Sequence, residues 1–278
     1  MSILDFVGNT PTVELWQGVY AKLEMKNPSG SVKDRAAKAI LENANLPRES
    51  RIVEATSGNF GISLAMISAV MGYSLIVVMP EGASVEREKI IRLYGGRVVR
   101  VDGDMSVARD VARKIAMEEK AFMPDQFSNP ANPLAHYSTT APEILRDLDY
   151  VDIFVCGVGS GGSITGVARY LKERNPQTRV VAVHPSQGSM IEGIGAGFMP
   201  PIFDSSLANE DIFVSFNEAV YYSRLLARKY GIMAGISSGA AAFAAKIISN
   251  RPENRGKTIV AILPDSGDRY FSTPLFAL

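Results

Sequence analysis

Residues 153–166 read IFVCGVGSGGSITG and combine an apolar run, a glycine-rich turn and the start of a helix. The run Ile153 to Cys156 predicts a buried strand. Five glycines with interleaved hydroxyls follow in 157–166. Such a turn lets a ligand approach the backbone, and the N–H groups of the next helix favour a phosphate dianion. A purely structural turn, the alternative, seldom needs so many glycines.

Strand-like and helix-like runs alternate through most of the chain. The alternation predicts an α/β fold with open, twisted, mostly parallel sheets flanked by helices. Besides 153–156, the predicted strands are Val19–Leu23, Arg51–Glu54, Leu75–Met79, Arg97–Val101, Val180–Val183 and Thr258–Leu263. The predicted helices include Ser84–Tyr94, Ser106–Glu119, Ser163–Arg174 and Asn217–Tyr230.

Length and charge narrow the class of protein. A chain of 278 residues predicts roughly two domains. Its 29 Lys plus Arg balance 29 Asp plus Glu without a basic block, which argues against nucleic-acid or membrane-surface binding. One cysteine fits a reducing compartment, and the N-terminus MSILDFVGNTP lacks the pattern of a signal peptide. We therefore expect a cytoplasmic protein with a small ligand.

The uncharged stretch Thr56–Pro80 is long enough to cross a bilayer as a helix. Gly72-Tyr73-Ser74 divides it, however, into a small-residue half suited to a buried helix and a β-branched half suited to a strand. No membrane span is predicted.

A lysine lies in the turn NPSGSVKDR, residues 27–35. Ser31 and Asp34 form an S-x-x-D pattern that predicts a capping box, with Lys33 in the first helical turn. The positive end of the helix dipole disfavours an ammonium there and should lower the lysine pKa, as a Schiff-base lysine requires. The alternative is an exposed lysine in a turn.

Two further turns carry hydroxyl groups at predicted helix starts, TSGNFG at 56–61 and GISSGA at 235–240. The first would suit a carboxylate, and ordinary helix capping is the alternative for both. Cys156 is expected in the core rather than as a nucleophile. His136 and His184 show no metal-ligand spacing, so no metal site is predicted.

Together these segments resemble the cysteine synthase (O-acetylserine sulfhydrylase) family of fold type II pyridoxal-phosphate enzymes, which are relatives of cystathionine β-synthase and have a tryptophan synthase β-like fold. The likeness covers nearly the whole chain. It rests on residues 7–11, 27–35, 54–61, 125–133, 137–144, 157–166, 193–198, 235–239 and 265–273.

The resemblance implies roles for particular residues. Lys33 would form the Schiff base with pyridoxal 5'-phosphate and then act as the catalytic base. Ser237 would face the pyridine nitrogen and leave it largely unprotonated, which favours elimination chemistry. The phosphate would bind Gly159, Ser160, Gly161, Gly162 and Ser163, the ring hydroxyl would bind Asn59, and the substrate carboxylate would bind Thr56, Ser57, Gly58, Asn59 and Gln126.

The implied reaction is a β-replacement that makes L-cysteine from O-acetyl-L-serine and sulfide through an aminoacrylate. Residues 34–130 would form a smaller, mobile substrate-binding domain, and residues 1–33 plus 131–278 a larger cofactor-binding domain. A homodimer is expected, and the C-terminal tail of serine acetyltransferase is a candidate partner.

Three departures from the family pattern concern the substrate. Phe60 and Ala141 replace a common Thr and Gly, and the stretch 184–193 is short. Serine, O-phosphoserine or cysteine as substrate, or a non-catalytic partner-binding role, therefore stay open. O-phosphoserine would need a cation near its leaving group, and residues 193–198 supply none.

Overall fold

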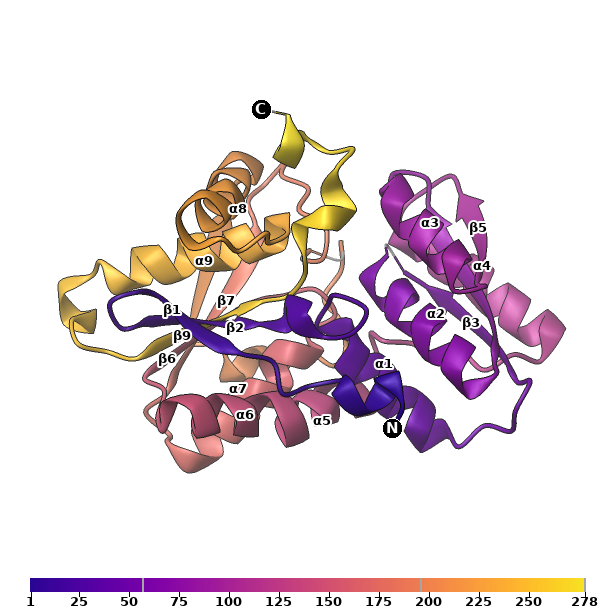
Figure 1. The fold of residues 1–278 in the computed structure, drawn as a ribbon, viewed down its shortest axis with the longest axis horizontal. Helices are drawn as coiled ribbons and strands as arrows, with labels where there is room; N and C mark the ends of the chain where they lie inside the picture. Colours follow the sequence, from indigo (N-terminus) through magenta and orange to yellow (C-terminus); the bar gives the residue numbers. More distant parts are fainter. Residues whose placement is uncertain (57, 196, 278) are drawn as a thin grey trace.

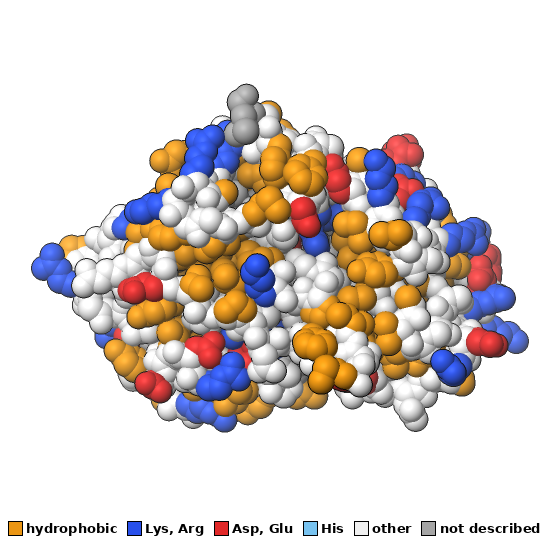
Figure 2. All heavy atoms as spheres, in the orientation of Figure 1, with side chains coloured by type: hydrophobic (Ala, Val, Ile, Leu, Met, Phe, Trp, Pro, Cys, Tyr) orange, Lys and Arg blue, Asp and Glu red, His pale blue; other side chains and the backbone are white. Residues whose placement is uncertain are grey.

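The computed structural model describes residues 1–56, 58–195 and 197–277. Two sheets lie side by side, each with helices on both faces (Figure 1). The predicted α/β class is therefore confirmed. On the face shown in Figure 2, basic and acidic side chains are interspersed without a field of one sign.

The larger sheet has six strands in the order β1-β2-β9-β6-β7-β8. All neighbours run parallel except the hairpin β1-β2. The strands are β1 (Thr12–Trp16), β2 (Val19–Leu23), β6 (Ile153–Gly157), β7 (Arg179–Pro185), β8 (Glu210–Val214) and β9 (Ile259–Leu263).

Helices cover both faces of this sheet because its central strands are apolar on both sides. Val155 and Ala261 pack with α8 and α9 on one face, and Phe154 and Val260 pack with α6 and α7 on the other. The helices of this part are α5 (Ala131–Ala135), α6 (Ala141–Leu148), α7 (Gly162–Arg174), α8 (Phe216–Tyr230) and α9 (Ile236–Ser249).

The smaller sheet has three parallel strands in the order β3-β4-β5. Its elements are β3 (Arg51–Ala55), β4 (Ser74–Pro80), β5 (Arg97–Val101), α1 (Lys33–Ala44), α2 (Asn59–Met71), α3 (Val85–Leu93) and α4 (Met105–Glu119). All three strands fall within 34–130, but that exact division into domains stays a prediction.

The uncharged stretch 56–80 folds as α2 and β4, as predicted, and Gly72 ends the helix with a φ of +77°. Across the described ranges, no helix is long and apolar enough to cross a membrane.

Every predicted strand is present, whereas β1 and β8 were not predicted. Along β8 the side chains Glu210 and Ile212 are half-buried while Asp211 and Phe213 are exposed. This edge strand therefore lacks the continuous apolar run that marks the central strands.

Candidate active site

A cavity of about 840 Å³ lies at the carboxyl ends of strands from both sheets. Thr56 follows β3, Pro80 ends β4 and Gly157 ends β6, and all three line it. Ligands of open α/β sheets bind at such strand ends. Of the predicted site residues, the cavity is lined by Lys33, Thr56, Asn59, Gln126, Gly159, Ser160, Gly161, Ser163 and Ser237.

Two predicted residues are not among the lining residues. Gly58 is the N-cap of α2 and lies against the side chain of Arg87, and Gly162 begins α7. Ser57 lies outside the described residues.

Lys33 is the first residue of α1, as predicted, and its Nζ donates to Ser160 Oγ at 3.4 Å. Burial lowers the pKa of Lys33, against the opposing influence of Cys156 and Asp265. The predicted lowering of the Lys33 pKa is confirmed, but burial rather than the helix dipole is its main cause. A lysine in this state is a better nucleophile and base at neutral pH.

The predicted capping box at Ser31 and Asp34 is wrong. Val32 is the N-cap and makes no side-chain cap hydrogen bond. The Asp34 carboxylate instead accepts from the Ser29 backbone N–H at 2.7 Å and from Ser63 Oγ at 2.6 Å. Asp34 thus holds the turn that precedes Lys33 against α2.

The glycine-rich turn leaves backbone donors free at the start of α7. Gly161 is the N-cap with a φ of +87°, and no side chain among the described residues forms a cap hydrogen bond at this helix start. A Cβ on Gly161 would collide with Phe203, and one on Gly162 would collide with Asn132. The turn therefore fits an anion, and its glycines are required by close packing.

His136, for which no metal-ligand role was predicted, contacts this turn through Ser163. Its Nε2 lies 3.1 Å from Ser163 Oγ and its Nδ1 lies 2.9 Å from Thr140 Oγ1. Burial, reinforced by Arg35, lowers the pKa of His136 to about 3. A neutral imidazole has one donor and one acceptor nitrogen, so it can fix the direction of both hydroxyls.

Asn132 connects the turn to the predicted carboxylate site. Its Nδ2 donates to the Gln126 carbonyl at 2.8 Å and to Ser160 Oγ at 3.1 Å. Thr56 Oγ1 accepts from the Gly58 N–H at 3.1 Å. Phe60, which replaces a Thr common in the family, packs in the core of the smaller sheet and offers no hydroxyl to a carboxylate.

Ser237, in the first turn of α9, has a buried Oγ without a hydrogen-bond partner among the described residues. A buried unpaired hydroxyl is destabilising unless something completes it. The cavity therefore fits a pyridine aldehyde that carries a phosphate. The Lys33 amine suits the aldehyde, the N–H groups of the glycine turn suit the phosphate, and the Ser237 hydroxyl suits the ring nitrogen.

Arg87 on α3 was not predicted as a cavity residue. It is 1% exposed, contacts Glu192, and its guanidinium lies 4.7 Å from the centre of the Tyr270 ring. Its Nη1 is the atom that contacts Glu192, and its Nε lacks a hydrogen-bond partner in the described part of the chain. Residues 193–198, where a cation for an O-phosphoserine leaving group was expected, contain none.

Cys156 is buried among apolar residues of the larger sheet, as expected. Burial raises the pKa of its thiol to about 12, so it is protonated at neutral pH. This state does not suit a nucleophile.

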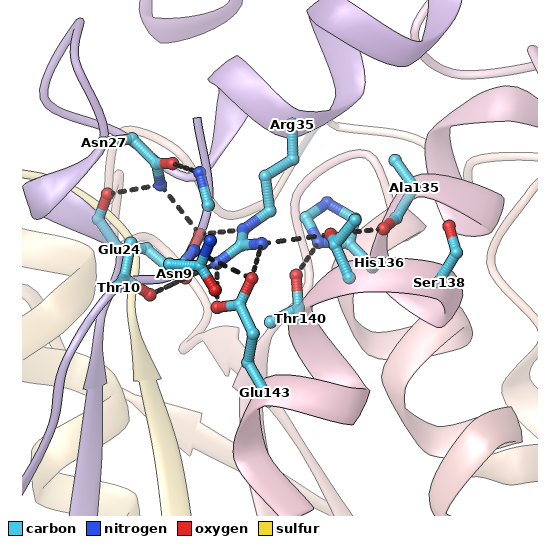
Figure 3. A network of polar contacts seen from close by, with 12 residues as sticks. Asn9, Thr10, Glu24, Asn27, Arg35, Ala135, His136, Ser138, Thr140 and Glu143 are labelled. Atoms are coloured by element: carbon cyan, nitrogen blue, oxygen red, sulfur yellow. Dashed lines mark hydrogen bonds and ion pairs between the residues drawn. The ribbon is translucent and has the colours of Figure 1, made fainter. Parts of the chain in front are cut away.

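A buried ionic network anchors α1 two residues beyond Lys33 (Figure 3). Arg35 Nε lies 2.7 Å from Glu24 Oε2, and Arg35 Nη1 lies 2.7 Å from Glu143 Oε1. Thr10 Oγ1 donates to Glu24 Oε1 at 2.6 Å. These contacts join the N-terminal segment, α1 and α6 beneath the cavity.

Known proteins match this chain along nearly its whole length. The profile of a family described as "Pyridoxal-phosphate dependent enzyme" matches residues 3–265. Cysteine synthase 3 of Caenorhabditis elegans is 42% identical, with 98% of this chain and 89% of the relative covered. A cysteine synthase of Staphylococcus aureus (strain Mu50 / ATCC 700699) is 40% identical, with 99% and 97% covered.

Solved structures of such enzymes also superpose on this chain over nearly its whole length. An O-ureido-L-serine synthase superposes with a TM-score of 0.95 at 40% identity, covering 99% of this chain and 95% of the other. A hydrogen sulfide-producing enzyme from Fusobacterium nucleatum has a TM-score of 0.93 at 40% identity, covering 97% and 99%. The chain therefore belongs to the pyridoxal-phosphate-dependent enzyme family, in the fold type II group that includes the cysteine synthases.

Proposed function

We propose that the protein makes L-cysteine from O-acetyl-L-serine and sulfide by β-replacement at Lys33. The observation that carries the proposal is the meeting of three features in one cavity. These are the buried amine of Lys33, the uncapped glycine turn at 159–163 and the unpartnered hydroxyl of Ser237. They match the aldehyde, phosphate and ring nitrogen of pyridoxal phosphate.

The proposal assigns each part of the cofactor to residues of this chain. Lys33 would hold the aldehyde carbon, residues 159–163 the phosphate, Asn59 the ring hydroxyl and Ser237 the ring nitrogen. When bound, the cofactor supplies an electron sink for the bond to the α-proton.

The chain's own groups would bind substrate and move protons. Thr56, Ser57, Gly58, Asn59 and Gln126 would hold the carboxylate. The free amine of Lys33, whose pKa is lowered by burial, would take the α-proton of the bound substrate. Movement of residues 34–130 toward the larger sheet would exclude water during the reaction.

A second substrate is favoured by one observation. Arg87 places a buried cation at the cavity wall, although residues 193–198 supply none. A guanidinium suits an anionic leaving group such as phosphate, so O-phosphoserine is the second candidate. Glu192 already contacts Arg87 and would have to release it, which leaves O-acetylserine as the leading candidate.

The decisive experiment is a visible-absorption titration of the purified protein. O-acetylserine is added first, O-phosphoserine is added to a parallel sample, and sulfide is added last. A cofactor band that O-acetylserine shifts and sulfide restores supports the proposal. A band that responds only to O-phosphoserine identifies the second candidate, and the absence of any band after added pyridoxal phosphate contradicts the enzymatic role.

The proposal extends to the oligomeric state, the location and a binding partner of the protein. We propose a homodimer, a cytoplasmic location and binding of a serine acetyltransferase C-terminal tail at the same cavity. Size-exclusion chromatography with light scattering tests the first, cell fractionation the second, and competition between a synthetic tail peptide and O-acetylserine the third.

A further inference from the structure

The segment Asp265–Tyr270, just after β9, has no role in the proposed reaction, yet it contacts three parts of the site. Asp265 forms a β-bridge with Ser31 in the lysine turn. Its carbonyl accepts from the Gly235 N–H at 2.9 Å, just before Ser237. The segment therefore connects the starts of α1 and α9, and its side chains extend the connection to α2.

Both ends of the Asn59 side-chain amide are bound by this segment. Asn59 Nδ2 donates to Asp265 Oδ2 at 2.6 Å, and Asn59 Oδ1 accepts from Arg269 Nη1 at 2.9 Å. Tyr270 Oη also donates to Asp265 Oδ2, at 2.7 Å. The partners of Asn59 are thus an acceptor on one side and a donor on the other.

This pairing determines which way the amide faces. If the amide were flipped, its nitrogen would meet the guanidinium, which has only donors, and its oxygen would meet the carboxylate. Both contacts would become repulsive. Nδ2 carries two hydrogens and Asp265 takes one, so the other remains available to a ligand.

Arg269 couples this amide to the lysine turn. It is 2% exposed, and its Nη2 donates to the Ser29 carbonyl at 2.9 Å. Gly30 has a φ of +85°, and a Cβ there would collide with Arg269 Nη2. The guanidinium therefore fills the space beside the turn that carries Lys33.

We propose that Arg269 and Asp265 are positioning residues that hold the Asn59 amide with its free N–H toward the ring hydroxyl of the cofactor. This inference rests on the proposed function. A donor at this oxygen favours its ionised form, and Arg269 ensures that the donor rather than the carbonyl is presented.

The test is a double-mutant cycle on cofactor affinity, measured on apoprotein by equilibrium titration with pyridoxal phosphate. Arg269→Met and Asn59→Ala are expected to weaken binding by about tenfold each, the size of one buried hydrogen bond. Because Arg269 acts through Asn59, the double variant should bind about as well as Asn59→Ala alone. Arg92→Met, at an exposed arginine of α3, is the control and should match wild type.

A spectroscopic readout separates positioning from a general loss of structure. In Arg269→Met the fraction of cofactor with an ionised ring hydroxyl should fall, and its visible band should titrate at higher pH than in wild type. Arg269→Lys keeps the positive charge but loses the planar guanidinium that binds Asn59 and Ser29 together. The pH at which the visible band titrates should therefore shift in the same direction, but by less. If Arg269→Met does not fold, the cycle is run with Arg269→Lys.

The outcomes are distinct. Additive losses in the cycle, or an Arg269 variant with the wild-type band, would overturn the positioning role while leaving the proposed function intact. Wild-type protein that binds no pyridoxal phosphate would overturn both.

Discussion

The network around Arg35 and the wall of the cavity are both buried and polar, but they differ in how completely their groups are paired. Glu24 is bound by Thr10, Asn27 and Arg35, and all three nitrogens of the Arg35 guanidinium have acceptors (Figure 3). In the cavity, Ser237 Oγ and Arg87 Nε have no hydrogen-bond partner within the described ranges.

The difference separates groups that maintain the fold from groups that await a ligand. An unpaired buried polar atom destabilises a protein by about 1–3 kcal/mol. The fold tolerates this penalty where a bound molecule removes it. Replacing a paired residue should therefore change stability, and replacing an unpaired one should change ligand binding.

The largest effect is expected at the cavity. Lys33→Ala removes the amine that would hold the cofactor and move the α-proton, so turnover should fall by about a thousandfold or more. The fold should survive, as judged by circular dichroism and the melting temperature. Turnover near the wild-type rate would refute the assignment of Lys33.

Arg35→Met tests the network, and the effect should be on stability. Removing the guanidinium leaves Glu24 as a buried, uncompensated charge and leaves Glu143 with Lys22 as its partner cation, so the free energy of unfolding should drop by about 3–5 kcal/mol. Urea unfolding of the apoprotein measures this. Cofactor affinity at a temperature where the variant is folded should stay close to that of wild type. A large loss of affinity would contradict the separation between groups that maintain the fold and groups that bind the ligand.

Glu54 on β3 is a buried carboxyl with a hydrogen bond, and its effect on the stability of the fold should depend on pH. It accepts from the Asp125 N–H at 2.7 Å, and burial, followed by the charge of Asp125, raises the pKa of Glu54 to about 8. The folded protein then holds a proton that the unfolded chain has lost, so this contribution to stability declines as pH rises from about 4.5 to 8.

Glu54→Gln should therefore flatten the pH dependence of unfolding over that range, by up to about 1.4 kcal/mol per pH unit. Denaturant titrations at closely spaced pH values measure the slope. An unchanged slope would show that Glu54 titrates in the same way in both states.

The smallest effects come from a matched pair of hydroxyl deletions. Ser237→Ala removes a buried hydroxyl that has no partner among the described residues, so apoprotein stability should rise by about 1 kcal/mol while cofactor affinity falls. Thr10→Val removes the donor to Glu24 and should cost about 1–2 kcal/mol of stability at unchanged affinity. The opposite pattern in the two variants would invalidate the comparison.

The sequence predicted the features that short segments encode. Strands such as 153–156 were visible because a strand covered on both faces needs an unbroken apolar run. The glycine turn at 157–162 was visible because close packing allows no side chain at its four glycines. The capping box was predicted wrongly because Ser29 and Ser63, the latter on another helix, bind Asp34.

Contacts between distant segments could not be predicted. Asn59 and Arg269 are 210 positions apart, and nothing in either segment indicates that they meet. Arg87 and Glu192 lie in segments with no shared pattern, so the cation in the cavity was missed. The segments that line the cavity were thus easier to predict than the contacts between distant segments.

The strand order also constrains when each part of the molecule can form during synthesis. β9 pairs with β2 on one side and β6 on the other, although it is the last strand in the sequence. While a ribosome is still adding residues before 259, the N-terminal hairpin has no sheet to join. The smaller sheet is contiguous from 51 to 101 and can fold first. The larger sheet cannot close until β9 has been synthesised, so the cofactor pocket is completed only after residue 263 has been added.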